Sequence, residues 1–229
     1  MTLLIIAFLF AMPASKTAPR TVAEKALDAQ DRAKLEKLAS EAAVTADMQR
    51  TDLDAQYRSA QLHSLLAQLA IEVGDKTLGR KAAEAGMEAA RRAVQLKDSS
   101  AENHRILGTL CGQIIPANVM MGLKYGKCAM EEVQKAMQMD PKSWLVWVSR
   151  GVGNYYLPPA FGGGVNLAIQ DFEKAIAINP DAAEAHLWLG IALRKAGRNG
   201  DARKALAKAV ELNPERRWAK QQLEKTPAQ

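Results

Sequence analysis

The stretch AEAHLWLGIALRKAGRNGDARKALAKAVELNP, residues 183–214, consists of two amphipathic segments and ends at a proline. Its second half (201–214) aligns without gaps with LAIQDFEKAIAINP (167–180), 34 residues upstream. Two earlier segments follow the same pattern, AMEEVQKAMQMDP (129–141) and, more weakly, GMEAARRAVQLKD (86–98). Repetition at a period of this length is typical of helical pairs that stack on one another. The sequence therefore predicts an all-α solenoid.

Small side chains and prolines recur at equivalent positions of these repeats. In the last repeat we expect the two helices to approach most closely at Gly190, Ala202 and Ala209, where a larger side chain would force them apart. Pro214 ends the second helix, because proline cannot continue the hydrogen-bond ladder. The corresponding signature residues of the two preceding repeats are Gly108, Ala129, Ala136 and Pro141, followed by Gly151, Ala168, Phe172, Ala175 and Pro180.

This signature resembles that of the tetratricopeptide repeat (TPR) family, in which helix A carries a Leu-Gly pair and helix B carries small residues before a closing proline. Leu189, Gly190 and Pro214 stand in those places of the last repeat, and Leu193 replaces the usual aromatic residue of helix A. The resemblance is strongest in the last two repeats. It implies a TPR-type array within residues 51–229, with about four helical pairs at 54–98, 101–141, 143–180 and 183–214.

Two features point to a narrower likeness, namely the apolar N-terminal segment and the sequence FGGG (161–164) inside the third pair. In this combination the chain resembles exported bacterial TPR proteins similar to the T component associated with TRAP-type transporters. It also resembles the regulator-of-microtubule-dynamics group. Either likeness implies that a hydrophobic ligand is handled in a central pore or groove.

The two ends of the chain are predicted to lie outside the repeats. Residues 1–18 contain an apolar run that is too short to span a bilayer, which is typical of a signal peptide, or of an N-terminal anchor if it is retained. We expect residues 19–50 to form one capping helix on the first repeat. Residues 215–225 are predicted to form a second capping helix, with Trp218 and Leu223 facing the last repeat and its charged residues facing water.

The composition limits the classes of partner. The 229 residues are 48% hydrophobic and 5% aromatic, with a net charge of +6 and a pI near 9.3. Because no run of five or six like charges occurs, we expect the basic residues to lie on solvated helix faces and to form no nucleic-acid site. The expected partner is a protein or peptide, and membrane association is expected only through residues 1–18.

Two inserts lengthen the connections between helices A and B of adjacent repeats. One lies around IIPANVMMG (114–122) and the other is LPPAFGGG (157–164). Glycines before a helix can cradle a phosphate, but no Gly-Lys-Ser/Thr follows them and no predicted strand precedes them, so we interpret the second insert as a wide turn. Inserts in solenoids collect on one face, which is often the binding face. Their apolar residues either bind a partner or complete a small satellite core.

The concave groove is the other candidate site. Helix A positions that face the groove in such repeats are largely apolar here, with two arginines at the rim. Such a groove suits a hydrophobic peptide segment or an amphipathic anion such as a fatty acid. Alternatively, tight coiling buries these residues between neighbouring helices. The candidate binding residues of the groove and inserts are Arg105, Leu145, Val148, Val152, Tyr155, Phe161, Leu187, Ile191 and Arg194.

No catalytic constellation is readable, and we expect no enzyme activity, no metal and no cofactor. Cys111 and Cys128 either form one disulfide in an oxidising compartment or are two small buried side chains. His104 and His186 fall at the same repeat position, which favours packing over metal binding.

The predicted function is a non-catalytic scaffold or adaptor that mediates protein–protein interaction in the cell envelope, with the chain exported to the periplasm or secreted. The alternative is a carrier or sensor that binds a hydrophobic or anionic small molecule, such as a lipid, in an apolar groove or pore. The scaffold is preferred, because binding is the usual use of stacked repeats and their stability comes from stacking alone.

Overall fold

The computed structural model describes residues 20–117 and 119–228, and within these ranges the chain consists of helices and their connections, with no strand. The predicted all-α architecture is therefore confirmed. The predicted signal segment, residues 1–18, lies outside the described residues. Among the helices that the structure describes, none has the length and apolar character needed to cross a bilayer.

The helices follow one another in four pairs with capping helices at both ends. They are α1 (Val22–Asp28), α2 (Arg32–Met48), α3 (Leu53–Val73), α4 (Lys76–Leu96), α5 (Ala101–Ile114), η1 (Ile115–Ala117), α6 (Val119–Met139), α7 (Trp144–Tyr156), η2 (Pro159–Phe161), α8 (Val165–Ile178), α9 (Ala183–Lys195), α10 (Asn199–Leu212) and α11 (Arg217–Glu224). The pairs α3–α4, α5–α6, α7–α8 and α9–α10 are the repeats, and each helix packs most extensively on the other member of its pair.

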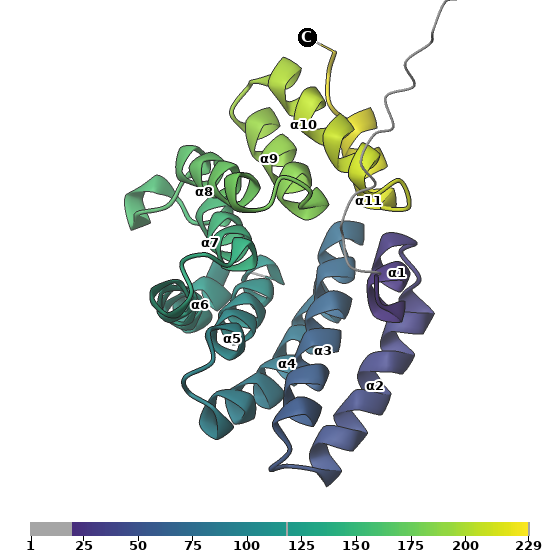
Figure 1. Ribbon diagram of the computed structural model, residues 1–229, viewed down its shortest axis with the longest axis vertical. Coiled ribbons are helices and arrows are strands. Elements are labelled where there is room, and N and C mark those ends of the chain that lie inside the picture. Colours follow the sequence, from purple (N-terminus) through teal and green to yellow (C-terminus); the bar gives the residue numbers. More distant parts are fainter. Residues whose placement is uncertain (1–19, 118, 229) are drawn as a thin grey trace, which may run out of the picture.

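The four repeats curve into a ring (Figure 1). The first helices of the pairs contact one another in order, α3 to α5, α5 to α7 and α7 to α9, while α6, α8 and α10 lie outside them. The turn that follows α1 lies next to α11, where the amide side chains of Gln30 and Gln221 pair at 3.1 Å. The two ends of the array therefore meet.

The glycine of the repeat signature marks the closest approach of the paired helices. A Cβ atom added at Gly190 would collide with Leu206 and lie 3.0 Å from the carbonyl oxygen of Ala202. At Gly151 such an atom would lie 2.5 Å from the ring of Phe172. Helix A therefore has room only for hydrogen at this position, as the pattern of small residues predicts.

A ring N–H group joins each of three repeats to the one before it. His104, Trp147 and His186 occupy equivalent positions of α5, α7 and α9. Each places a ring nitrogen within 2.9 Å of a backbone carbonyl oxygen two residues beyond the end of the preceding helix. These carbonyl groups lie in the connections between helices and have no partner in a helix, so the side chains supply their donors. The histidines thus have the packing role that the sequence predicts.

The N-terminal cap differs from the single helix predicted for residues 19–50. Helix α1 ends at Asp28, Gln30 adopts a φ of 52°, and α2 begins at Arg32. The side chain of Asp31 accepts a hydrogen bond from the backbone N–H of Lys34 at 3.0 Å and so starts the new helix. This break lets α1 contact both α2 and α3.

The first insert is largely helical, whereas the sequence analysis predicted a loop. The chain makes one short 3₁₀ turn after Ile114, and α6 begins at Val119, so most of the added residues lengthen α6 at its N-terminal end. Met, Leu and Lys are good helix formers and are frequent there. A disulfide between Cys111 and Cys128 joins α5 to α6, which decides between the two alternatives for these cysteines.

The second insert is a turn in which each glycine has a structural reason. Gly162 and Gly164 have φ angles of 84° and 121°, which L side chains rarely adopt. A Cβ atom at Gly163 would collide with the carbonyl oxygen of Leu157. The backbone N–H groups of residues 161–164 all donate to carbonyl oxygens of α7 or of the turn itself. They are therefore not available to a phosphate, and the interpretation as a wide turn is confirmed.

Buried apolar side chains of the described residues form two large clusters. One is drawn from α1–α6 and the other from α7–α11, and we call these parts the N-terminal and C-terminal lobes. Only a small third cluster, Ala136, Met137 and Val146, lies at their junction, with Trp147 packed against it. The ring thus has two apolar cores.

Candidate functional site on the inner face

Most of the apolar residues predicted for the groove belong to the core of the C-terminal lobe. Val148, Leu187 and Ile191 are buried in its apolar cluster, and Val152 and Tyr155 pack against that cluster. Close coiling of neighbouring helices covers these side chains, which is the alternative that the sequence left open. They stabilise the stack of repeats and offer little surface to a ligand.

Arg105 is paired within the inner face and does not stand free at a rim. Its guanidinium donates to both carboxylate oxygens of Glu102 at 2.5 and 2.6 Å and to the hydroxyl of Ser149 at 3.3 Å. The hydroxyl of Tyr57 donates to the same carboxylate at 2.7 Å. Burial works against the charge of Glu102, but the hydrogen bonds from Arg105 and Tyr57 lower the pKa of this carboxyl below its usual value. The arrangement ties α3, α5 and α7 together.

Arg194 holds the C-terminal cap onto the last repeat. Its guanidinium donates to the side-chain oxygen of Gln222 at 2.5 Å, to the carbonyl oxygen of the same residue at 3.1 Å and to the hydroxyl of Thr226 at 3.1 Å. Trp218 is buried and Leu223 partly buried against the C-terminal cluster, as predicted for this cap. Both arginines predicted for the groove are thus engaged in intramolecular contacts.

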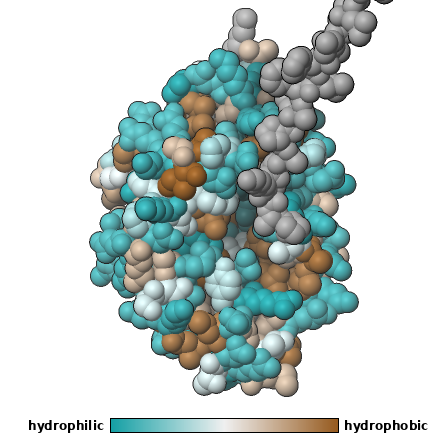
Figure 2. Space-filling model, viewed as in Figure 1, coloured by the Kyte–Doolittle hydropathy of each residue, from teal (hydrophilic) through white to brown (hydrophobic). Residues whose placement is uncertain are grey.

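The inserts, in contrast, expose apolar side chains. Phe161 on η2 is 71% exposed, and Met120 and Leu123 near the start of α6 are 64% and 79% exposed. Leu145, another predicted binding residue, is exposed at the start of α7. Figure 2 shows hydrophobic residues on one face of the molecule in separate patches among hydrophilic ones, not as one continuous area. The predicted site residues therefore do not converge on a single groove.

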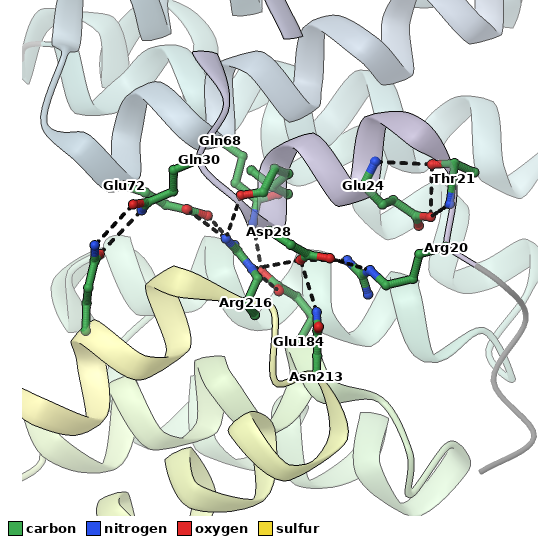
Figure 3. Close-up of polar contacts among 12 residues, drawn as sticks. Arg20, Thr21, Glu24, Asp28, Gln30, Gln68, Glu72, Glu184, Asn213 and Arg216 are labelled. Carbon is green, nitrogen blue, oxygen red and sulfur yellow. Dashed lines mark hydrogen bonds and ion pairs between the residues drawn. The ribbon is translucent and has the colours of Figure 1, made fainter. Parts of the chain in front are cut away.

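The ring closes through a polar cluster that the sequence analysis missed. Arg216, just before α11, is buried and donates to both carboxylate oxygens of Glu72, the longer contact being 2.9 Å. Its Nε lies 3.5 Å from the carboxylate of Glu184 and 3.8 Å from that of Asp28 (Figure 3). We call these four residues the closure cluster. They come from α1, α3, α9 and the turn before α11.

Further polar contacts surround the closure cluster (Figure 3). Asn213 donates to Asp28 at 3.0 Å, and Gln68 donates to Glu184 at 2.7 Å, so both contacts join the two lobes. The backbone carbonyl oxygen of Leu27 accepts a hydrogen bond from the guanidinium of Arg216 at 3.4 Å. The residues named here thus join the lobes through hydrogen bonds and ion pairs.

Burial controls the protonation of these carboxyls. Removal from water raises the pKa of Glu72 to about 7, although the charge of Arg216 opposes the shift. Burial also raises the pKa of Asp28, against the charge of Arg20. For Arg216, burial disfavours the charge, but Glu184 and Glu72 outweigh it and raise the pKa. The arginine stays charged while Glu72 titrates near neutral pH.

One signal in the sequence could have indicated this cluster. Glu72 interrupts an apolar run, LAIEV (69–73), and a carboxylate in such a place needs a partner. That partner, Arg216, is 144 residues away, and it lies in a segment whose charges were predicted to face water. That prediction is wrong for Arg216, because closure of the ring buries its side chain against α3.

Aromatic rings from α7, α8, α9 and α11 contact one another. Tyr155 and Tyr156 contact Trp188 edge to face, with ring centroids 5.9 and 6.4 Å away. Tyr156 is 46% exposed, and burial of the rest of the side chain, together with Tyr155 and Glu72, raises its pKa to about 12. Its ring is therefore near the closure cluster and still reached by water.

A metal site is not evident among the described residues, and a hollow beside the first insert is small. No group of three or more His, Cys, Asp or Glu side chains is placed to hold a metal ion in this part of the chain. A hollow between α3, α4 and the first insert, lined among others by Ile71, Arg80 and Pro116, measures about 90 Å³. Sites for drug-sized ligands are typically roughly 300–1,000 Å³. This hollow is therefore too small for a lipid.

Comparison with known proteins identifies the repeats. Residues 162–217 match the tetratricopeptide repeat family. The solved structure of TTC0263, a thermophilic TPR protein of Thermus thermophilus, aligns over 83% of this chain and 99% of that chain, with 17% identity and a TM-score of 0.53. Residues 162–217 therefore match tetratricopeptide repeats, and the ring as a whole has the fold of a TPR solenoid.

Other solved TPR structures resemble the chain more loosely. MamA aligns over 86% of this chain and 98% of that chain, with 19% identity and a TM-score of 0.43. YrrB, described as a TPR protein with an unusual peptide-binding site, aligns over 88% of this chain and 97% of that chain, with 15% identity and a TM-score of 0.46. No curated protein sequence matches the chain. The narrower likeness to exported TPR groups stays a prediction.

Proposed function

We propose that this chain is a non-catalytic protein-interaction scaffold of the cell envelope, and that it binds its partner through the α6–η2 surface, defined by Met120, Leu123 and Phe161. The observation that carries the proposal is the contrast between the two predicted sites. The groove residues are buried or paired within the chain, whereas these three apolar side chains of the inserts are exposed. Exposed methionine and aromatic side chains suit a protein partner, because they adapt to its surface.

The form of the array supports the same choice. TPR solenoids usually serve as binding scaffolds, and the curvature of stacked repeats creates their binding surfaces. Here the ends of the array meet and α3 contacts α9 through Gln68 and Glu184, so the inner face is narrowed by the chain itself. A partner is expected at the outside of the ring. We do not extend the proposal to a lipid carrier, because both candidate cations of the groove, Arg105 and Arg194, are engaged.

The envelope location rests on two further features. Residues 1–18 contain an apolar run of the length expected for a signal segment. The Cys111–Cys128 disulfide is of a kind that persists in oxidising compartments and is rare in the cytosol. Cell fractionation with maleimide trapping tests this part. We expect the protein in the envelope fraction without reactive thiols, and reduced protein in the cytosol would contradict it.

Photo-crosslinking tests the binding surface. Benzoylphenylalanine replaces Leu123 or Phe161 in the full chain, and Val44 on α2, 58% exposed, provides a matched exposed apolar control on another part of the ring. We expect one shared crosslinked protein from positions 123 and 161 and none from position 44. If position 44 gives the same product, or if 123 and 161 give none, the α6–η2 surface is not where the partner binds.

A further inference from the structure

The contacts between the two lobes differ from those within them. Inside each lobe a large apolar cluster spans several helices. Among the residues that the structure describes, the lobes share only the small apolar cluster of Ala136, Met137 and Val146 at the connection from α6 to α7. Beside it, the hydroxyl of Ser149 on α7 contacts Arg105 and Thr109 on α5. At the opposite side of the ring, the closure cluster and its amide neighbours join the lobes.

The closure is held by charge more than by apolar burial. The side chains of Glu72 and Arg216 are 0% and 2% exposed. Both groups are therefore removed from water, and they pair with each other through two hydrogen bonds. Attraction between buried charges is largely offset by the cost of removing them from water, so such a pair adds little net stability. Loss of one partner is nevertheless strongly unfavourable, because the other charge remains buried. The pair therefore requires a particular geometry of the two side chains, and it contributes little to the free energy of ring closure.

The charges at the closure are also unbalanced once Glu72 is ionised. Three carboxylates, of Asp28, Glu72 and Glu184, face the guanidinium groups of Arg216 and Arg20. Opening of the ring would return Glu72 and Arg216 to water and relieve the repulsion among the carboxylates. Opening would not disrupt either apolar core, since neither core crosses the closure.

We propose that Arg216 is a releasable latch, and that the ring opens at the closure cluster while the two lobes turn as rigid bodies about the connection between α6 and α7. That connection, residues 140–143, contains no helix and is bordered by the small junction cluster. The open form presents the inner ends of α3 and α7, with Gln68, Glu72 and the ring of Tyr156, to solvent. This inference goes beyond the proposed scaffold function and does not depend on the α6–η2 surface.

Spin-label distances across the ring test the latch. Labels replace Lys37 on α2 and Lys204 on α10, whose side chains are 71% and 83% exposed and lie in different lobes. In the full chain with its disulfide intact, we expect one short, narrow distance population. In Arg216→Gln we expect a second, longer population, with the opening constant raised roughly a hundredfold, because Glu72 loses its partner.

A matched variant separates opening from general damage. Arg150→Gln removes an arginine that pairs at 2.5 Å with Asp171, a carboxylate 4% exposed, but this pair lies wholly within the C-terminal lobe. We expect its distance distribution to equal that of the parent. The latch is refuted if folded Arg216→Gln keeps the single short distance, or if Arg150→Gln gives the longer population equally.

The parent chain provides a measurement that needs no variant, should Arg216→Gln fail to fold. Glu72 interacts with Arg216, Glu184, Gln68 and Tyr156, and burial raises the pKa of its carboxyl, so that the closed ring favours the protonated form. We therefore expect the longer population to grow from pH 5.5 to pH 8.5. An unchanged distribution across this range would overturn the latch in that case.

Discussion

The interior of each lobe and the boundary between the lobes are built on opposite principles. Within a lobe, helices approach so closely that Gly151 and Gly190 have room only for hydrogen, and apolar side chains fill the rest. Across the closure, Arg216 and three carboxylates make specific contacts with little apolar area. The difference shows that stacking alone stabilises neighbours along the array, whereas contact between its two ends requires particular residues.

Truncation of one core residue in each lobe should give the largest effects and would test whether the cores are independent. Leu110 and Phe172 are fully buried in the N-terminal and C-terminal clusters. We expect Leu110→Ala to lower the free energy of unfolding by about 2–5 kcal/mol and Phe172→Ala by about 3–5 kcal/mol. Hydrogen exchange followed by mass spectrometry should show faster exchange mainly in the lobe that carries the change. Equal acceleration in both lobes would mean that they unfold as one unit.

Reduction of the disulfide should have the next largest effect, and only in the N-terminal lobe. The bridge closes a loop of 17 residues between α5 and α6. Loops of this length contribute about 3 kcal/mol to stability by restricting the unfolded chain. We expect the free energy of unfolding, measured with denaturant, to be lower by about 3 kcal/mol in the presence of reductant. The double variant Cys111→Ala, Cys128→Ala should be insensitive to reductant, and a loss of protection in α9–α10 would contradict the separation of the lobes.

A single methyl group at the helix contact of the last repeat should have a smaller effect. Gly190→Ala forces Leu206 aside, and overpacking of this kind costs about 1–3 kcal/mol. Gly200, in α10, is the matched control, because nothing lies within 4 Å of an added Cβ atom there. Gly200→Ala is expected to stabilise by about 0.5–1 kcal/mol through helix propensity. Thermal unfolding measures the melting temperature of both variants. A lower value for Gly190→Ala and a higher value for Gly200→Ala would confirm the close approach, and equal shifts would exclude it.

Titration of Glu72 should change the closure while leaving the cores intact. Its pKa is about 7 in the closed ring, against a usual 4.5, because burial favours the protonated form. The closed ring therefore holds the proton more tightly than the open ring, and closure weakens as pH rises between 4.5 and about 7. Above that range no further change from this group is expected. In Glu72→Gln, spin-label distances should lose this dependence, and a parent-like pH profile would assign it to another group.

The local features of the fold are predictable from sequence, because they depend on residues close together in the chain. The spacing of Ala202, Ala209 and Pro214, repeated upstream, predicts the helical pairs, and Gly190 predicts their close approach. For Cys111 and Cys128 the sequence leaves two alternatives, since spacing alone does not tell whether a bridge forms.

Predictions fail where a local signal is weak. The predicted N-terminal cap is one continuous helix that includes Asp31, although this residue starts α2. A loop is predicted after Ile114, although the residues there favour helix. Both errors arise because the break or continuation of a helix depends on one or two residues and on contacts with neighbouring helices.

The candidate sites required the tertiary structure. Sequence position placed Leu187 and Ile191 in a groove, but how tightly a solenoid coils depends on small rotations summed over all repeats, and here coiling buries them. The pairing of Glu72 with Arg216 also depends on these accumulated rotations, since only a closed ring brings residues 144 positions apart into contact. The repeats and their helix contacts therefore follow from patterns of neighbouring residues in the chain. The place where the two ends of the array meet follows from the folded molecule, because curvature is a property of the whole array.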